Sequence, residues 1–373
     1  MKLALGVLLV FLASRTLGAA DSWTSTDSMR SPRANFTLTL LTDGRVLAAA
    51  GNDGRDCLAD CELYDPARRQ WSRTGALSRP RRSHTATLLP DGRVLVVGGF
   101  VDGYLKETEI FDPKLEAWSE AGELAEARDS HTATLLPDGR VLIAGGFGPG
   151  KPLASVEIFD PRNNVWQSAP SMPTPRAYHV AVRLNDSEIL IAAGEGGEHA
   201  AEPPLDNLAT CSIFRFRENA WFPAASLSVP HAYGESGLLL PGGLVLLMGG
   251  EGNSARARYP ALPVAEIFHP AEGLWRVVQP MNDARHFHSA VKLADGRVLV
   301  AGGWRSNSRA EPLATAELFD PKAKTWHRSA SMRHARAGHG AVLLPDGSVL
   351  AAGGDDAEGR SLADAEIFTP EGS

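Results

Sequence analysis

A phrase of roughly fifty residues recurs along the chain, and this repetition constrains the fold more than any other feature. Residues 81–118 contain SHTATLLPDGRVLVVGG, then TEIFDP and a tryptophan; residues 128–166 contain SHTATLLPDGRVLIAGG, then VEIFDP and a tryptophan. Further copies occupy 285–326, 336–370, 33–71, 176–221 and 231–275. Tandem copies of one unit indicate a single repeat architecture rather than unrelated domains.

Each copy predicts four strands joined by tight turns. In the second copy, residues 84–89 are β-branched and apolar, and the Pro-Asp-Gly turn at 90–92 leads into a second apolar run at 93–97. Two glycines end that run where the backbone must bend. A third strand covers 109–111, an Asp-Pro turn follows, and Trp118 opens the fourth strand. Four antiparallel strands per copy are typical of a β-propeller blade.

Tryptophans mark the fourth strands, and we expect them to be structural. They are Trp23, Trp71, Trp118, Trp166, Trp221, Trp275 and Trp326. Trp23 precedes the first copy, whereas the last copy ends without a tryptophan strand of its own. We therefore predict an all-β, seven-bladed propeller with four antiparallel strands per blade. The N-terminal Trp23 strand would complete the last blade and close the ring, which removes an open sheet edge.

The repeated features resemble those of the kelch family. They are the Arg-x-x-His opening, the double glycine, the aromatic-Asp-Pro turn and the tryptophan. The resemblance implies a kelch-type propeller similar to the propeller of galactose oxidase. The preference for arginine over lysine and the abundant alanine indicate a bacterial source.

Residues 1–20 have the pattern of an export signal. Lys2 is followed by an apolar run at 3–13, and small residues precede Asp21. The run is too short to cross a bilayer, and no later stretch approaches the length of a membrane span. We expect residues 21–373 to form one propeller domain that is periplasmic or secreted.

The charge balance argues against nucleic acid as a partner. The chain has a formal net charge of −7 at pH 7, and its basic residues form no cluster. Binding to a phosphate backbone requires concentrated positive charge. We expect a monomer with a protein or glycan ligand.

Function is expected on the propeller face that carries the longer loops. The short Asp-Gly and Asp-Pro turns share one face, and the second-to-third strand loops share the other face with the blade-to-blade connections. The longest loops belong to blades four to six and carry charges of both signs. The candidate ligand-binding residues are Glu198, His199, Glu202, Asp206, Arg256, Arg258, Tyr259, Trp304 and Arg305.

A basic residue opens the innermost strand of every blade. The residues are Arg33, Arg81, Arg128, Arg176, His231, Arg285 and Arg336. If they face the central opening, they form an anion-attracting channel collar. In the architectural alternative, which their recurrence favours, each arginine pairs with a glutamate of the repeat. Those glutamates are Glu62, Glu109, Glu157, Glu266, Glu317 and Glu366.

Histidines and cysteines suggest structural roles. The repeat histidines are His84, His131, His179, His288 and His339. Metal ligands must converge within a few ångströms, whereas equivalent positions are spread around a ring, so we expect structural hydrogen bonds and no metal or cofactor. Cys57 and Cys61 are expected to form a local disulfide outside the cytoplasm, and Cys211 to be a buried free thiol.

Two enzymatic alternatives accompany the binding interpretation. Resemblance to galactose oxidase implies a copper-ligand pair at Tyr178-His179, but that family also needs a tyrosine crosslinked to cysteine, for which Cys211 is the candidate. Sialic acid mutarotases resemble the chain in architecture but carry a long insertion that it lacks. No catalytic residue is assigned. The leading interpretation is a non-catalytic binding module for a protein or carbohydrate, with a sugar-active enzyme as the alternative.

Overall fold

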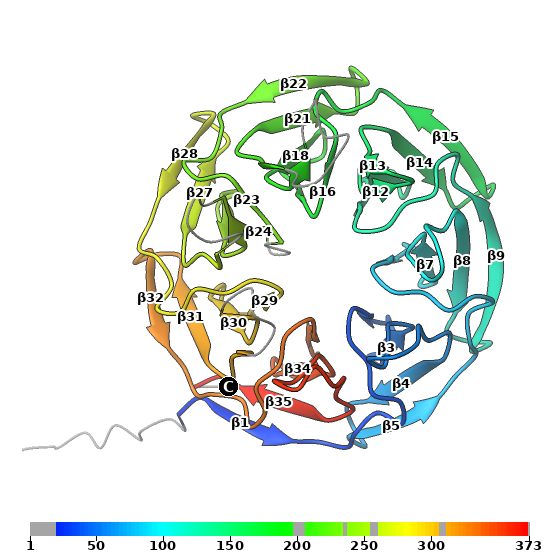
Figure 1. Ribbon diagram of the computed structural model, residues 1–373, viewed down its shortest axis with the longest axis vertical. Helices are drawn as coiled ribbons and strands as arrows, with labels where there is room; N and C mark the ends of the chain where they lie inside the picture. The colour runs from blue at the N-terminus through cyan, green and yellow to red at the C-terminus, as the bar shows by residue number, and fades with distance from the viewer. Residues whose placement is uncertain (1–19, 197–205, 234–236, 254–259, 306–310, 372–373) are drawn as a thin grey trace, which may run out of the picture.

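The computed structural model describes residues 20–196, 206–233, 237–253, 260–305 and 311–371. Within these ranges every regular element is a β-strand, and no helix is long and apolar enough to cross a membrane. Seven four-stranded antiparallel sheets are arranged in chain order around a central axis (Figure 1). The predicted all-β propeller is confirmed.

The first four blades follow one another along the chain, each with its strands in order from the axis outward (Figure 1). Blade one contains β2 (Thr37–Leu40), β3 (Val46–Ala49), β4 (Cys61–Asp65) and β5 (Gln70–Arg73). Blade two contains β6 (Thr85–Leu88), β7 (Val94–Val97), β8 (Glu107–Asp112) and β9 (Ala117–Glu123). Blade three contains β10 (Thr132–Leu135), β11 (Val141–Ala144), β14 (Val156–Asp160) and β15 (Val165–Ala169). Blade four contains β17 (Val180–Arg183), β18 (Glu188–Ala192), β21 (Cys211–Arg215) and β22 (Ala220–Ala224).

The remaining blades repeat this plan. Blade five contains β24 (Gly237–Leu239), β25 (Val245–Met248), β27 (Ala265–His269) and β28 (Leu274–Val277). Blade six contains β29 (Ser289–Lys292), β30 (Val298–Ala301), β31 (Ala316–Asp320) and β32 (Thr325–Arg328). Blade seven contains β33 (Gly340–Leu343), β34 (Val349–Ala352), β35 (Ala365–Thr369) and the N-terminal β1 (Ser22–Ser25).

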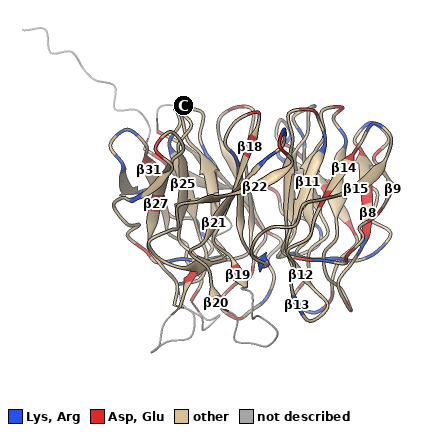
Figure 2. Cartoon of the chain, turned by 90° about the horizontal axis from the view of Figure 1, so that it is seen from above, with Lys and Arg blue, Asp and Glu red and all other residues tan. Residues whose placement is uncertain are grey.

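Short strands outside the blades project on the long-loop face, where several carry labels in Figure 2. They are β12 (Phe147–Gly148) with β13 (Lys151–Pro152), β16 (Arg176–Ala177) with β19 (Glu195–Gly196) and β20 (Asp206–Asn207), and β23 (His231–Ala232) with β26 (Glu251–Gly252).

The hydrophobic core lies between neighbouring blades. The second strand of each blade is buried, as β7 shows, because sheets pack against both of its faces; the first residue of β18, Glu188, is partly exposed. One cluster joins Leu47 and Leu63 of blade one to Val94 and Phe111 of blade two. The blades therefore stabilise one another, and none has a closed core of its own.

Each fourth-strand tryptophan packs against an aromatic residue of the third strand in the same blade. In the last blade the Trp23 ring lies 5.2 Å from that of Phe368, and in blade six Trp326 lies 5.0 Å from Phe319. These contacts explain why the Phe/Tyr-Asp turn and the tryptophan recur together, since aromatic pairs add stability beyond the area they bury.

The two ends of the chain meet in blade seven. Strand β1 pairs antiparallel with β35, with Trp23 opposite Phe368, and the Trp23 indole N–H donates to the carbonyl oxygen of Ala330 (2.9 Å). Figure 1 shows β1 beside β35 at the outer rim. The outermost strand of this blade thus comes from the opposite end of the sequence.

A ring of backbone hydrogen bonds joins each blade to the next. The second glycine of every double-glycine position, or its equivalent, donates its N–H to the carbonyl oxygen of the basic residue that opens the following blade. The bond is 2.9 Å in each of the pairs Gly51–Arg81, Gly99–Arg128, Gly146–Arg176, Gly194–His231, Gly250–Arg285, Gly303–Arg336 and Gly354–Arg33. The last pair links blade seven to blade one.

The second position of the double glycine requires glycine. A Cβ at Gly99 would lie 2.8 Å from the carbonyl oxygen of Arg82 in the same blade, and the residue has a φ of 107°. The first position, with a φ of 59° at Gly98, also accepts alanine, since Ala50 and Ala193 occupy it with φ of 55° and 61°. The second glycine is thus explained by close contact within its own blade.

Replacing Trp23 by alanine tests the contribution of β1. We expect Trp23→Ala to lower the free energy of unfolding by about 3–5 kcal/mol, as expected for loss of a large buried aromatic side chain. Urea unfolding should show a similar loss for Trp326→Ala, which removes the equivalent contact within blade six. A loss below about 1 kcal/mol for Trp23→Ala, with a full loss for Trp326→Ala, would show that β1 contributes little.

Candidate functional site

A buried arginine–glutamate pair holds the inner part of most blades together. In blade two, Arg81 donates to the carbonyl oxygens of Gly98 (3.0 Å) and Glu107 (2.9 Å) and to Glu109 Oε1 (2.8 Å). The Arg81 side chain has no exposed area. The same pair recurs as Arg33–Glu62, Arg128–Glu157, Arg285–Glu317 and Arg336–Glu366.

The glutamate of each pair also fixes the connection from the preceding blade. The backbone N–H of Ser78 donates to Glu109 Oε2 (2.9 Å), and that of Ala125 donates to Glu157 Oε2 (2.8 Å). The arginine therefore satisfies carbonyl groups within its own blade, while the glutamate satisfies an N–H group of the incoming chain. Buried charges of this kind need such complete pairing.

This geometry corrects the interpretation of the basic residues as a channel collar. Their side chains are buried inside the blades: each arginine bonds to carbonyl oxygens of its own blade, and all of the arginines but Arg176 also bond to a carboxylate. The residues concerned are Arg33, Arg81, Arg128, Arg176, His231, Arg285 and Arg336.

Blades four and five lack the complete pair. In blade four, Ser212 occupies the glutamate position and Arg176 bonds instead to Thr210, through the carbonyl oxygen (2.9 Å) and Oγ1 (3.0 Å). Burial lowers the pKa of Arg176 to about 10, so it remains charged at neutral pH. In blade five, His231 replaces arginine while Glu266 remains and accepts from the N–H of Ser228 (3.1 Å). The repeat is thus interrupted in adjacent blades.

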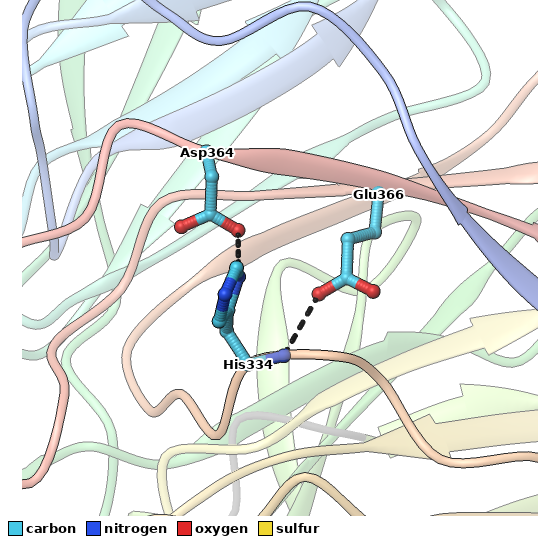
Figure 3. A group of neighbouring side chains, drawn as sticks. All are labelled: His334, Asp364 and Glu366. Carbon is cyan, nitrogen blue, oxygen red and sulfur yellow. Dashed lines mark hydrogen bonds and ion pairs between the residues drawn. The ribbon is translucent and has the colours of Figure 1, made fainter.

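One cluster in blade seven has the composition of a metal site. Figure 3 shows His334, Asp364 and Glu366 side by side. Their ligand atoms lie within 4.8 Å of one another. However, Arg336 donates to both carboxylates, and His334 Nδ1 already lies 2.9 Å from Asp364. A cation there would meet the guanidinium charge. The cluster is the arginine–glutamate pair of this blade with a histidine attached.

Among the described contacts, four of the five repeat histidines bond across blade boundaries, and His288 is the exception. His131 Nε2 lies 2.9 Å from Thr85 Oγ1 of the preceding blade, and His179 Nε2 lies 2.9 Å from Thr132 Oγ1. Burial lowers the pKa of His84 and of His179 to about 3, so these imidazoles are neutral near pH 7. No three of the repeat histidines in the described chain converge as metal ligands do. Their geometry agrees with structural hydrogen bonding.

Acid should destabilise the protein through these histidines. Below about pH 6.5 a histidine in the unfolded chain gains a proton, while one buried with a pKa of about 3 does not. Stability is therefore lost as the pH falls from about 6.5 toward 3, by about 1.4 kcal/mol per pH unit for each such residue.

His179→Phe isolates one of these contributions, since blade one already carries Phe36 at the equivalent position. Between pH 7 and 5.5, urea unfolding should show a smaller loss of stability in this variant, by about 1 kcal/mol. His327→Phe, at an exposed position, should keep the full loss. An unchanged pH dependence in His179→Phe would contradict the assignment.

A second ring of backbone hydrogen bonds surrounds the central axis. The residue two places after each buried basic residue has a left-handed conformation, with φ between 49° and 62°. In six of these residues the backbone N–H donates to the equivalent carbonyl oxygen of the preceding blade, at 2.9 to 3.3 Å. The ring residues are Asn35, Ser83, Ser130, Tyr178, Tyr233, Phe287 and Gly338.

Two cavities adjoin this ring along the axis. The inner cavity, of about 270 Å³, is lined by repeat imidazoles and by hydroxyls of the innermost strands. The outer cavity, of about 280 Å³, has more polar than apolar groups. Both are lined by Asn35, Tyr178, Phe287 and Gly338, which form the neck between them.

The outer cavity has an aromatic side and a polar side. The Tyr178 and Tyr233 rings are 4.0 Å apart, and the Tyr233 and Phe287 rings are 5.2 Å apart. Trp304 also lines this cavity. Blades one, two and seven contribute most of the polar lining. Blade five adds Glu251, and blade six adds His286. The polar lining residues are Asn35, Asn52, Arg82, Glu251, His286 and Asp355.

Charged groups on the aromatic side are held by specific contacts. The Tyr233 hydroxyl donates to Glu195 Oε2 (2.7 Å), and burial strongly raises the pKa of this tyrosine. His286 Nδ1 lies 2.9 Å from Glu251 Oε1. The arrangement combines flat apolar surfaces with hydrogen-bonding groups of fixed position, as small-ligand pockets do.

Three positions per blade build this outer site: the two residues after the buried basic residue, and the residue after the double glycine. Backbone bridges bring them together, as in His286 with Trp304 and Ala337 with Asp355. Within an otherwise uniform repeat these positions differ from blade to blade. The residues after the glycines are Asn52, Phe100, Phe147, Glu195, Glu251, Trp304 and Asp355. This variation is the sequence signal that would have identified the site.

The structure places only part of the loop-face candidate site. Glu198, His199, Glu202, Arg256, Arg258 and Tyr259 lie outside the described residues. Asp206 is exposed on β20, and Arg305 is exposed and lies 3.7 Å from Asp283. Trp304 is buried and lines the axial cavity instead of presenting an exposed ring.

The expected disulfide is corrected, since Cys57 and Cys61 are free thiols. Cys61 lies in β4 and packs in the core between blades one and two, whereas Cys57 Sγ contacts the carbonyl oxygen of Phe100 (3.5 Å). The two side chains therefore point to different surroundings. Cys211 is a buried free thiol, as expected, and burial raises its pKa to about 11.

Comparison with known proteins agrees with this architecture. The kelch motif matches residues 81–125, 130–173 and 285–333. Alpha-scruin of Limulus polyphemus is 30% identical over 132 residues, which are 34% of this chain and 14% of that protein. Galactose oxidase of Gibberella zeae is 36% identical over 94 residues, or 23% of this chain and 14% of that protein. The matches thus span a small part of these relatives.

A solved structure extends the likeness to nearly the whole chain. A fungal alcohol oxidase of the AA5 family, in complex with copper, superposes with a TM-score of 0.71 and covers 95% of this chain and 77% of its own. At 17% identity the likeness concerns the fold. The repeats, the fold and the motif matches define the class: this chain is a β-propeller that carries kelch motifs.

Of the residues that the resemblance to galactose oxidase implies, Tyr178 and His179 line the inner cavity together, whereas Cys211 lines neither axial cavity. His179 is buried, its Nε2 contacts Thr132, and it does not line the outer cavity. Cys211 lies in the core between blades four and five, where its Sγ contacts the carbonyl oxygen of Ala209 (3.6 Å). Among the described lining residues, the outer cavity has one imidazole, that of His286, and the inner cavity has those of His84, His131, His179 and His339.

Proposed function

We propose that this protein is an extracytoplasmic binding propeller that holds a small carbohydrate in the outer axial cavity. The observation that carries the proposal is the two-sided lining, with aromatic rings facing polar side chains. A pyranose ring has the matching surfaces, since its C–H groups pack on aromatic rings and its hydroxyls bond to amides and charged groups.

The size and shape of the cavity favour a sugar over a protein surface. Its volume of about 280 Å³ is near the lower end of ligand pockets, which span about 300–1,000 Å³. A protein partner would need a contact area of about 800 Å² on each side. One or two sugar units fit the axial cavity, whereas a protein could insert only a side chain.

Export is part of this proposal and rests on the signal pattern of residues 1–20. Mass spectrometry of the protein from the producing cells tests it. A mature chain that begins near Asp21 would support export, and a full-length cytoplasmic chain would contradict it.

Exchanging an aromatic residue between blades tests the binding site. Tyr178→Ser places at this position the residue that blades two and three use there, Ser83 and Ser130. The fold should tolerate the change, while affinity for a glycan selected on an array should fall at least about tenfold, since one aromatic contact is lost. Isothermal titration calorimetry measures the effect.

Leu115→Ser is the control, because Leu115 is 74% exposed and does not line the cavity. It should bind the selected glycan as the unchanged protein does. Equal binding by Tyr178→Ser would remove the axial cavity from the proposal. Selection of a protein partner, with no glycan bound, would favour the protein ligand instead.

A further inference from the structure

Two carboxylates lie together on the aromatic side of the outer cavity. Glu251 lines the cavity. Glu195 lies behind Tyr233 and accepts a hydrogen bond from the Tyr233 hydroxyl (2.7 Å). Asn207 connects them: it is the register partner of Glu195, and its side-chain amide donates to the carbonyl oxygen of Glu251 (2.7 Å). Neighbouring blades thus bring both acids to one place.

These carboxylates have little compensating charge. Among the described residues, no lysine or arginine forms an ion pair with either, unlike the repeat glutamates, five of which pair with a buried arginine. Burial raises the pKa of Glu195, and the charge of Glu251 raises it further. Of the two acids, Glu251 has a contact with His286 Nδ1 (2.9 Å). Within the described part of the chain, both carboxylates therefore lie beside aromatic rings without a lysine or arginine paired to them.

Among the described lining residues, Arg82 on the other side of the cavity is a cation, and it already interacts with other groups. Arg82 lies over the Phe100 ring, 5.5 Å from its centre, and interacts with the charge of Asp129. It belongs to blade two, whereas the two glutamates belong to blades four and five. Its position leaves the aromatic side of the cavity negative.

The cavity also offers an unused hydrogen-bonding group. His286 is only 4% exposed, lines the cavity, and has no partner for Nε2 within the described chain. Buried polar atoms normally have partners, and a ligand in the cavity can supply one here. A ligand hydroxyl would satisfy it.

We propose that the carbohydrate bound here carries a protonated amine, as hexosamines do. The inference rests on the proposed carbohydrate site and adds the charge of its ligand. The ammonium group lies beside Glu251 and over the Tyr178 and Tyr233 rings, where carboxylate and π-face both attract a cation. The sugar ring packs on the aromatic residues, and a hydroxyl bonds to His286 Nε2.

Calorimetry with matched sugar pairs tests this inference on the full mature chain. The pairs are glucosamine with glucose, galactosamine with galactose, and mannosamine with mannose, at pH 6.5 and low salt. At least one amino sugar should bind about tenfold more tightly than its neutral partner. N-acetylation of that amino sugar should remove the advantage, because it removes the charge.

The variants Glu251→Gln and Glu195→Gln keep shape and hydrogen-bonding oxygen while removing charge. Each should weaken binding of the amino sugar about tenfold and leave the neutral sugar unchanged. Glu358→Gln, an exposed carboxylate elsewhere on the chain, is the matched control. Melting temperatures of the two cavity variants should equal or exceed that of the unchanged protein, since like-charge repulsion is relieved.

The experiments distinguish failure of the amine inference from failure of the carbohydrate proposal. Equal binding of amino and neutral sugars, insensitive to Glu251→Gln, would overturn the amine inference and leave the carbohydrate site standing. Absence of binding by all three amino sugars would overturn it as well. If no array glycan is bound either, the carbohydrate proposal itself fails. A lower melting temperature in Glu251→Gln would assign that carboxylate a structural role.

Discussion

The hydrogen bond from a glycine N–H to the carbonyl of the next blade's basic residue is the constraint on which the rest depends. It repeats at 2.9 Å between all neighbouring blades, and the glycine that donates it lies so close to a carbonyl group of its own blade that a Cβ would clash. The side chain of the buried arginine bonds to its own blade and so fixes the position of the arginine's carbonyl group. The glutamate accepts a hydrogen bond from the segment that connects the preceding blade to this arginine. Glycine, arginine and glutamate therefore recur together because one junction uses all three.

This junction places the variable residues at the axis. Because the backbone is fixed on both sides, the residues after the basic position and after the glycines face the opening with little freedom, and their side chains can change without disturbing the blade. Blades two and three place serine in the left-handed ring, whereas blades four to six place Tyr178, Tyr233 and Phe287. The blades that break the arginine–glutamate pair are among those that build the aromatic side. A rigid scaffold with a specialised sector is the arrangement expected of a binding protein.

The repeat sequence allowed the architecture to be predicted, since each strand, turn and tryptophan has a local physical cause that recurs. The pairing of arginine with glutamate was also foreseen as an alternative to the channel collar. The axial site was not predicted, because it forms from residues such as Tyr178, Glu251 and Asp355 that are distant in sequence and that only the closed ring brings together. The disulfide was misjudged because short spacing indicates proximity along the chain, whereas β4 directs Cys61 into the core.

The central claim is that ligand binds on the axis, above the left-handed ring and against blades four to six. A crystal structure of the protein with the tightest-binding hexosamine tests it most directly. The account predicts the sugar ring against Tyr178 and Phe287, with its amine beside Glu251 and a hydroxyl at His286 Nε2. A sugar bound only to the outer loops, or on the face of the Asp-Gly turns, with the axial cavity holding water, would contradict it.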